Sequence, residues 1–401
     1  MASTTDKNRE GFLLLPGLIG FIFAFRTCLT ILWFQDDPQQ ATILSASLSL
    51  ALLILAAFCS AGATPSIASS SFRTTPIRWL SALLGLALLS LLWSEAPLTA
   101  ALGYWASWAA DVAAVLLVLR SAVPAERQAE AIMKGFVWGS SIVAIVAWAT
   151  PAADDLRLGN EDFLHPNALG FLFAIATFLA IHLTRDNKIW RWPAFFLATT
   201  LLRTISKTSI IAFLAAFAFY LLRDSSMARI VKIRIGIAAG IILASLWGVL
   251  ETYLDKYTQG TGPETLTGRT LIWAVSLEYA LKKPLLGNGF YAYRFIVPHF
   301  DKFEAWQSHD ELLQQFFSFG ILGIILFIGI YWTFYRQLRR AHNSNIKTLA
   351  ATLLVFALVR GVADTGNFDL SYPLWLMTML SVLLASMPRK DQPAQSIPQE
   401  A

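Results

Sequence analysis

The sequence is poor in charged residues. Asp, Glu, Lys and Arg make up 14% of its 401 residues, against roughly 25% in soluble domains, while hydrophobic residues reach 56%. The apolar residues come in blocks close to the length of about 20 residues that spans a bilayer. We therefore predict an all-α polytopic membrane protein and not a set of soluble domains.

Cysteines and cofactor motifs are also scarce. The two cysteines, Cys28 and Cys59, both lie inside apolar runs, which argues against a disulfide scaffold. The chain has no HExxH motif, no cluster of Cys and His and no P-loop. We expect no metal, no other cofactor and no ATP-driven activity. The acidic pairs at 36–37 and 154–155 are interpreted as solvated acids of outer loops.

Twelve apolar segments are predicted to form a single membrane domain over residues 1–401, with no soluble domain and no sequence repeat. The first run, Gly11 to Phe34, is too long for a signal peptide and no small-residue cleavage site follows it, so we expect it to stay as the first span. The predicted spans are approximately 12–34, 42–60, 79–93, 100–119, 135–150, 166–184, 191–204, 208–222, 235–251, 311–334, 347–362 and 371–387.

The distribution of basic residues predicts the orientation. With the N-terminus inside, 20 of the 31 Lys and Arg fall in inner loops and 10 in outer segments, with Arg26 inside the first span. We expect an inner-membrane-type protein with both termini in the cytoplasm. The same bias accounts for the net charge of +5 without a nucleic-acid partner.

One predicted loop is long and carries its own helix. Residues 252–310 fall on the periplasmic side, and loops of this length are usually functional. Within the loop, the pattern from Thr267 to Lys283 predicts a helix lying along the membrane surface. Thr267 is its expected N-cap and Pro284 its end, with one apolar face formed by Ile272, Val275 and Tyr279.

Polar residues stand directly before the tenth apolar segment, in QSHDELLQQFFSFGILGIILF at residues 307–327. Ser308 followed by Glu311 matches a capping box, and acids such as Asp310 suit a first helical turn. Capping does not account for His309. The positive end of the helix dipole disfavours an imidazolium there, and a neutral imidazole can accept a proton. His309 is therefore the candidate catalytic residue.

Several cations are candidates for binding an anionic substrate. Arg269 opens the predicted loop helix, where it either reaches lipid phosphates or holds a pyrophosphate bidentately. Arg203 and Lys207 flank the hairpin of the seventh and eighth segments, as topological anchors or as ligands of an anion. Arg26 lies inside a span without a local partner and is a functional candidate. Arg157 receives no role.

Three other features have ordinary structural interpretations beside functional ones. Arg360 stands four residues before Asp364, which favours a local ion pair. His165 precedes Pro166 at a helix start, with a role as ligand or donor as the alternative. Gly287 and Gly289 indicate a turn that needs positive φ, or a backbone close to a ligand.

Five patches together resemble the O-antigen ligase and polymerase superfamily of bacterial membrane glycosyltransferases, in the order that family shows. They are LLWSEAPLTAALGYWASW, RLGNEDFLHPNALG, SKTS, LTGRTLIWAVSLEYALKKPLLGNGF and SHDELLQQFFSFGILGIILF, within residues 80–370 approximately. The resemblance implies a GT-C-type helical bundle. It also implies transfer of a glycan from an undecaprenyl diphosphate carrier to an acceptor hydroxyl outside the cytoplasmic membrane. That acceptor is lipid A core for a ligase, or another carrier-linked repeat for a polymerase.

The resemblance also implies roles for particular residues. His309 matches the family's loop histidine, and Arg269 matches the arginine of a G-R-x-x-x-W pattern. Lys207 stands where members often have Arg after Ser, and Asp310 where Asn commonly follows the histidine. In such a site Arg269, Lys207 and Arg203 stabilise the charge of the leaving diphosphate, and His309 acts on the acceptor hydroxyl. The chemistry then needs no metal.

The motifs leave rival functions open. Ligase and polymerase share these motifs and are not separated by them. A transporter or lipid flippase usually shows internal repeats and charges at the bilayer midplane, whereas here the polar residues gather in an outer loop. A non-catalytic assembly subunit would not need His309 and Arg269 at matched positions. We expect glycans, the lipid-linked donor and membrane lipids as partners.

Overall fold

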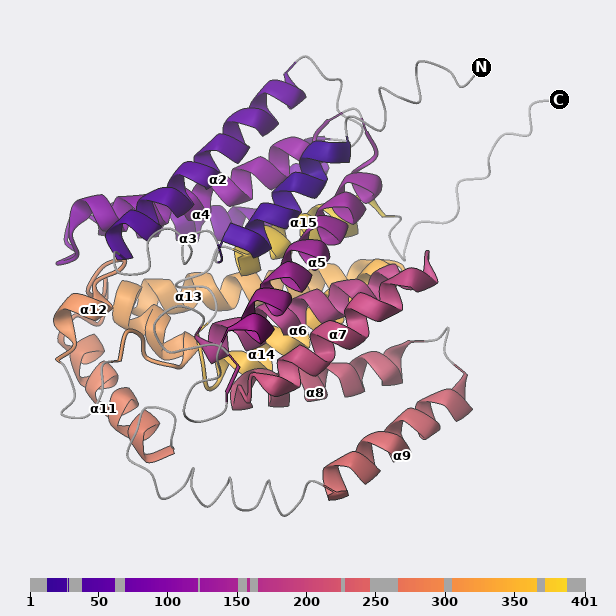
Figure 1. Cartoon of the computed structure of the whole chain (residues 1–401). Helices are drawn as coiled ribbons and strands as arrows, with labels where there is room; N and C mark the ends of the chain where they lie inside the picture. Colours follow the sequence, from indigo (N-terminus) through magenta and orange to yellow (C-terminus); the bar gives the residue numbers. More distant parts are fainter. Residues whose placement is uncertain are drawn as a thin grey trace.

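The protein is built from α-helices. The computed structural model describes residues 13–26, 28, 38–61, 69–121, 123–150, 157–158, 165–224, 228–245, 266–298, 305–365 and 372–387, and these contain no β-strand. Figure 1 shows most helices running in roughly the same direction, with α11 and α12 at one end of the bundle. The all-α class predicted from the sequence is confirmed, while the GT-C type of bundle stays a prediction.

The helices follow the predicted segments closely. A first helix covers Leu13–Arg26, and two 3-10 helices, η1 and η2, cover Ser69–Arg73 and Lys188–Trp190. The remaining helices are α2 (Pro38–Ser60), α3 (Thr75–Ser90), α4 (Leu98–Leu119), α5 (Ala125–Ala149), α6 (Pro166–Leu183), α7 (Arg191–Arg203), α8 (Lys207–Arg223), α9 (Arg229–Ser245), α11 (Leu266–Lys282), α12 (Tyr293–Ile296), α13 (Glu311–Arg340), α14 (Asn345–Gly361) and α15 (Tyr372–Ser386).

Each predicted span contains a helix, but the bounds differ where polar residues extend it. α5 begins at Ala125, ten residues before the predicted 135, because its first half is amphipathic and buries Ala129, Ile132 and Met133. By length and composition, 5 of the described helices can cross a membrane, namely α2, α4, α5, α6 and α13. Three shorter apolar helices accompany them, at Leu13–Arg26, Thr75–Ser90 and Leu374–Ser386. The number of twelve spans stays a prediction.

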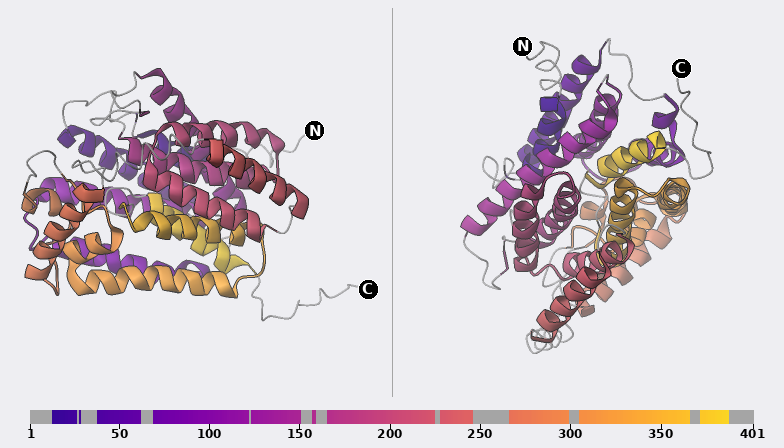
Figure 2. Two further views of the ribbon diagram at one scale, coloured as in Figure 1. Left: turned by 90° about the horizontal axis from the view of Figure 1, so that it is seen from below. Right: turned by 90° about the vertical axis from the view of Figure 1, so that its right-hand side faces the viewer.

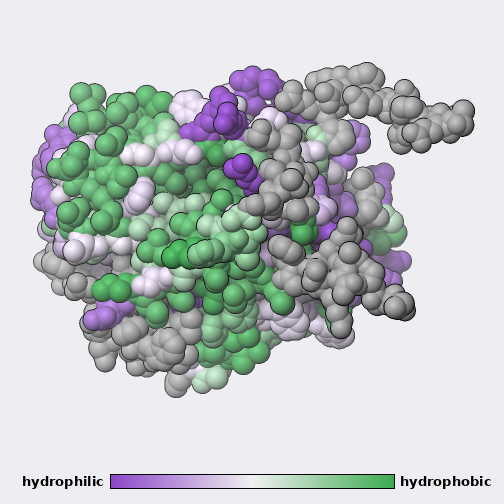
Figure 3. Space-filling view, turned by 90° about the horizontal axis from the view of Figure 1, so that it is seen from above, coloured by the Kyte–Doolittle hydropathy of each residue, from purple (hydrophilic) through white to green (hydrophobic). Residues whose placement is uncertain are grey.

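The apolar side chains are divided between the interior and one broad surface. The largest core cluster joins the first helix and α2 to α8 with α14, α15 and the end of α13. Other large apolar side chains point outward, including Phe58, which is 76% exposed, and Leu222, which is 82% exposed. Figure 3 shows a hydrophobic face with hydrophilic residues gathered toward its edges. Such a surface fits a multi-pass membrane protein whose helices contact lipid.

A turn between α11 and α12 bends α13. Gly320 has φ 62 inside α13, and the carbonyls of Phe317 and Ser318 accept hydrogen bonds from Asn288 and Gly289, both 2.9 Å. Gly287 has φ 67, and a Cβ there would lie 2.4 Å from backbone atoms of α13. The predicted positive φ of this turn is confirmed. The backbone of this turn lies close to α13, where the sequence left a ligand as the alternative. The contact fixes the first turns of α13, which follow His309.

The predicted loop helix is present as α11, which starts at Leu266. The expected N-cap was wrong, because Thr267 already lies inside the helix. The predicted face is confirmed: Ile272 is buried and belongs to a cluster with Tyr293 and Phe317. Figures 1 and 2 show α11 and α12 together at one end of the bundle. This face therefore packs on protein, and a position along the membrane surface stays a prediction.

Candidate functional site

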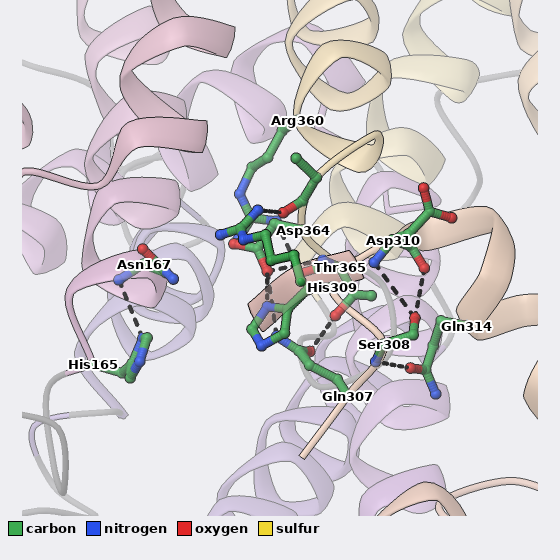
Figure 4. Close-up of polar contacts among 12 residues, drawn as sticks. His165, Asn167, Gln307, Ser308, His309, Asp310, Gln314, Arg360, Asp364 and Thr365 are labelled. Carbon is green, nitrogen blue, oxygen red and sulfur yellow. Dashed lines mark hydrogen bonds and ion pairs between the residues drawn. The ribbon is translucent and has the colours of Figure 1, made fainter. Parts of the chain in front are cut away.

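A buried carboxylate forms the centre of the candidate site. Asp364 follows α14, and its side chain is 1% exposed. Its Oδ2 accepts a hydrogen bond from Arg360 Nη2 at 2.7 Å. Its Oδ1 accepts from the Thr365 backbone N–H at 2.9 Å and from Gln307 Nε2 at 3.3 Å. The predicted ion pair between Arg360 and Asp364 is confirmed, and Figure 4 shows these side chains converging.

His309 faces this carboxylate from the other side. Its Nδ1 lies 3.4 Å from Asp364 Oδ1, and its side chain is 14% exposed. Burial raises the pKa of Asp364, but the Arg360 guanidinium, with His309 and Arg269, holds that pKa well below its usual range. An ionised Asp364 can only accept, so Nδ1 of His309 is the donor in this contact, and a neutral ring would then present Nε2 as an acceptor. Sequence analysis missed this pairing because 55 residues separate the two groups.

The backbone at His309 is unusual. His309 has φ 52, in the left-handed region that non-glycine residues seldom adopt. Ile205, in the turn between α7 and α8, has φ 51, although a β-branched residue is strained there. Strained positions of this kind cluster at functional sites because surrounding contacts hold them. Two of the predicted site segments, 203–207 and 307–311, therefore each contain one.

The helix cap differs from the predicted capping box. The N-cap of α13 is Asp310, whose Oδ1 accepts from the Leu313 backbone N–H at 2.7 Å. The Ser308 hydroxyl instead donates to the Asp310 carbonyl at 2.8 Å, and Glu311 is the first helical residue. His309 has a left-handed backbone and Asp310 an extended one, so neither is helical. The N-cap therefore lies at Asp310, two residues after the predicted Ser308. Burial raises the pKa of Asp310, and hydrogen bonds from Leu313 and Leu312 oppose that rise.

Arg269 reaches the same place from α11. Its side chain is buried, and Nη1 donates to the carbonyl of Ala363, the residue before Asp364. Its Nε is buried without a hydrogen-bond partner among the described residues. A buried guanidinium with an unused donor is uncommon and indicates a site for an acceptor. The structure therefore brings together His309 and Arg269, two residues that the sequence predicted, around Asp364.

Arg203 and Lys207 lie at the other side of Arg360. Arg203 ends α7 and Lys207 begins α8, which confirms the predicted tight hairpin. Arg360 Nε donates to Ser209 Oγ in the first turn of α8 at 3.5 Å. The hairpin is thus next to the candidate site.

A second polar group holds the hairpin in place. Arg157 Nη2 and Ser206 Oγ both donate to Asn167 Oδ1, at 3.1 and 3.0 Å. Arg157 Nε also donates to the Thr204 carbonyl at 3.4 Å. His165 Nδ1 accepts from the Asn167 backbone N–H at 3.2 Å, so His165 caps α6. Figure 4 shows His165 and Asn167 apart from the group around His309. The interpretation of His165 as a residue of a helix start is supported. The hydrogen bonds of Arg157 position the hairpin.

Arg26 belongs to a different part of the bundle. Its Nη1 donates to Asp111 Oδ2 at 2.8 Å and to Ser49 Oγ at 3.0 Å. The partner comes from α4, 85 residues later, so no local pattern could indicate it. A buried ion pair accounts for Arg26 without a role in the site.

The described residues contain no group of three or more His, Cys, Asp and Glu that could hold a metal ion. The acidic pairs Asp36–Asp37 and Asp154–Asp155 lie outside the described residues. Activity without a metal therefore stays a prediction.

Comparisons with known proteins agree with the motifs. Residues 192–328 match a family model described as O-Antigen ligase, a range that includes His309, Arg269, Lys207 and Arg203. The chain is 25% identical to the exopolysaccharide production protein ExoQ of Rhizobium meliloti, over 65% of this chain and 65% of that protein. It is 26% identical to an O-antigen ligase of Pseudomonas aeruginosa, over 43% of this chain and 40% of that protein.

Each match spans less than two thirds of the relative's own length. The resemblance to the O-antigen ligase superfamily is confirmed by the family model and these relatives. The chain is thus similar to the proteins of this superfamily over the residues that match.

Proposed function

We propose that this chain is a membrane glycosyltransferase that moves a glycan from undecaprenyl diphosphate to an acceptor hydroxyl at the periplasmic face. The observation that carries the proposal is the pairing of His309 with the buried carboxylate of Asp364, 3.4 Å away, beside Arg269. A structural histidine would not need a left-handed backbone and a buried acid to orient it. The similarity to polysaccharide-producing relatives supports the same reaction class.

The proposed step uses His309 as a general base. Nε2 accepts the proton of the acceptor hydroxyl while that oxygen attacks the anomeric carbon of the donor sugar. The bond between the anomeric carbon and the diphosphate oxygen breaks, and the carrier leaves as its diphosphate. Asp364 orients the ring through Nδ1 and stabilises the imidazolium that forms, as the acid of a catalytic triad does.

The cations are proposed to hold the leaving diphosphate. Arg269 retains the unused Nε donor at the edge of the Asp364 cluster. Arg203 and Lys207 flank the hairpin whose next turn contacts Arg360. Positive charge placed before the reaction stabilises the negative charge that develops on the departing diphosphate. In this arrangement the donor lies between α11 and the α7–α8 hairpin, with the acceptor at His309.

The acceptor has two candidates. Transfer to lipid A core is the ligase reaction, which the family model and the O-antigen ligase relative favour. Polymerisation of carrier-linked repeats is the alternative, and the match to the exopolysaccharide production protein covers more of this chain, 65% against 43%. A transporter or a non-catalytic assembly subunit would leave the His309 and Asp364 pairing unexplained.

A reconstituted transfer assay tests the proposal. Purified protein in liposomes receives a carrier-linked glycan and either lipid A core or a second carrier-linked repeat, with and without EDTA. We expect product in one acceptor arm, unchanged by EDTA and abolished in His309→Asn. The control is His342→Asn, which changes an exposed histidine after α13. Normal transfer by His309→Asn would refute the assignment, and loss of transfer in EDTA that a divalent ion restores would refute the metal-free mechanism.

A further inference from the structure

A cavity of about 480 Å³ lies where α3 begins and where α13 and α15 end. Its walls come from η1, the first turn of α3 and the last turns of α13 and α15. Measured along α13, Arg336 stands 25 residues after Glu311, or roughly 35 to 40 Å at the rise of an α-helix. The cavity is therefore separate from the candidate site around His309.

The cavity is strongly cationic. Four of its lining residues are Arg73, Arg78, Arg336 and Arg340, and none of its lining residues is Asp or Glu. The side chains of these four arginines have no hydrogen bond or ion pair with any other residue that the structure describes. Four guanidinium groups around one cavity repel each other, and an anion between them would relieve that repulsion. Guanidinium groups match the oxygens of phosphate bidentately.

Hydrogen bonds through Ser381 of α15 connect two residues that line the cavity, Thr74 and Gln337. Thr74 Oγ1 lies 2.8 Å from Ser381 Oγ, which donates to Gln337 Oε1 at 2.7 Å. Gln337 Nε2 also donates to the Ser381 carbonyl at 2.7 Å. These bonds join α3, α13 and α15, the helices that carry Arg78, Arg336 and Arg340 and the apolar lining residue Leu384.

The start of α3 adds to the attraction for an anion. Thr74 is the N-cap of α3, but its side chain makes no capping hydrogen bond, because its hydroxyl is bonded to Ser381. The uncapped first turn lines the cavity with Thr75 and Pro76. The partial positive charge of a helix N-terminus favours a phosphate group at this position.

We propose that this cavity is a binding site for a phosphate group, at the end of the bundle opposite the candidate active site. The lining also contains apolar residues, among them Pro76, Ala341 and Leu384, at the ends of apolar helices. A phospholipid headgroup has this combination of a phosphate and an apolar continuation. A soluble phosphate compound offers the same charge without that continuation, and the experiment separates these two sources.

The experiment measures ligand binding to protein reconstituted in nanodiscs. Wild type, the double variant Arg78→Gln/Arg336→Gln and the control Arg339→Gln are compared for thermal stabilisation in three conditions. The discs contain a neutral, phosphate-free galactolipid alone, that galactolipid with phosphatidylglycerol, or that galactolipid with added sodium diphosphate. Arg339 stands on the same turns of α13 but does not line the cavity, and it donates to Tyr335 at 3.4 Å.

We expect an affinity at least about 10-fold lower in the double variant than in wild type, because the variant loses two guanidinium groups that donate charge-assisted hydrogen bonds to the phosphate. Stabilisation of wild type by phosphatidylglycerol alone identifies a lipid headgroup. Stabilisation by diphosphate that the double variant loses identifies a soluble phosphate compound, because diphosphate bound at the candidate active site would stabilise both proteins equally. Unchanged binding by the double variant, or an equal loss in Arg339→Gln, would overturn the proposal.

A second measurement needs no variant. Phenylglyoxal modifies accessible arginines of the wild-type protein, and peptide mass spectrometry reads the extent at each position. A bound phosphate should slow modification of Arg78 and Arg336 and leave Arg339 unchanged. Equal protection of all three arginines, or protection of none, contradicts a site in this cavity.

Discussion

Two buried arginine–aspartate pairs in this bundle have nearly the same geometry and very different surroundings. Arg26 and Asp111 are 2.8 Å apart, and Arg360 and Asp364 are 2.7 Å apart. Both aspartates are fully buried. Around the first pair the contacts are hydroxyl groups, with Ser49 donating to or accepting from Ser107 at 3.0 Å. Around the second pair stand Gln307, Arg269 and a partly exposed histidine.

The difference shows what makes a buried ion pair a candidate for catalysis. Arg26 and Asp111 join the first helix to α4, and the hydrogen bonds described around this pair lead on to the hydroxyl groups of Ser49 and Ser107. Arg360 and Asp364 carry the same charges, but Asp364 also contacts His309, whose side chain is 14% exposed. A buried ion pair alone therefore indicates a structural role. A buried ion pair that also orients a partly exposed, titratable ring indicates a catalytic role.

Removal of the His309 imidazole should have the largest effect on transfer. General acid–base groups contribute on the order of 10² to 10⁴-fold in rate, so His309→Gly should lose about that much. Glycine accepts the φ of 52 at this position, so the backbone is not strained further. Added imidazole should restore part of the activity by occupying the vacated space. Binding of the carrier should be retained, and a variant that loses both binding and rescue would indicate a structural role.

Asp364→Asn should have the next largest effect. An amide cannot hold the Nδ1–H tautomer of His309 or stabilise its positive charge, so we expect a loss between about 10-fold and 10⁴-fold in turnover. The pKa of Asp364 is held below its usual range. The ionised carboxylate therefore contributes fully to the stability of the folded protein above about pH 4, and this contribution is lost as pH falls through the lowered pKa.

The matched control is Asp224→Asn. Asp224 is also buried and pairs with Arg185 at 2.7 Å, but it follows α8 at the other end of that helix. We expect Asp224→Asn to lower thermal stability and to leave turnover unchanged. Equal losses of turnover in the two variants would mean that any broken buried pair disturbs the enzyme, and the comparison between pairs would fail.

Arg269→Lys should have a smaller effect. Lysine keeps the charge but loses the planar fork that reaches the Ala363 carbonyl and an anion together. The loss of one charge-assisted hydrogen bond corresponds to about 10-fold. We expect a raised KM for the lipid-linked donor and an unchanged KM for the acceptor. A change confined to the acceptor would place the diphosphate elsewhere.

The helices were largely predictable because each is encoded by a continuous run of residues. The site was less predictable because its residues come from distant parts of the chain. Apolar runs and the positions of Lys207 and Pro284 place most helices to within a few residues. The larger differences are at α5, which begins at Ala125, at α9, which begins at Arg229, and at α13, which ends at Arg340. His309 and Arg269 were identified from motifs. The pairing of His309 with Asp364 was not, because no local pattern joins residues 55 apart. The cap at Asp310 was missed because nothing in the sequence indicates the left-handed φ of the preceding residue.

Asp111→Asn should have the smallest effect on transfer and a large one on stability. Breaking a buried ion pair by removing one charge costs about 3–5 kcal/mol, because the other charge stays buried without compensation. The thermal midpoint of Asp111→Asn in detergent should therefore fall, while the turnover of the molecules that remain folded should equal that of wild type.

The double variant Arg26→Leu/Asp111→Leu tests the reason for that loss. Replacing both charges with apolar side chains removes the uncompensated arginine, and well-packed apolar replacements of buried pairs are often neutral. We expect most of the lost stability to return, with turnover again unchanged. Measurement of active-site concentration with a bound carrier analogue keeps folded fraction and turnover apart. If turnover in these variants falls as far as it does in His309→Gly, Arg26 and Asp111 take part in the chemistry. The proposed difference between the two ion pairs would then be wrong.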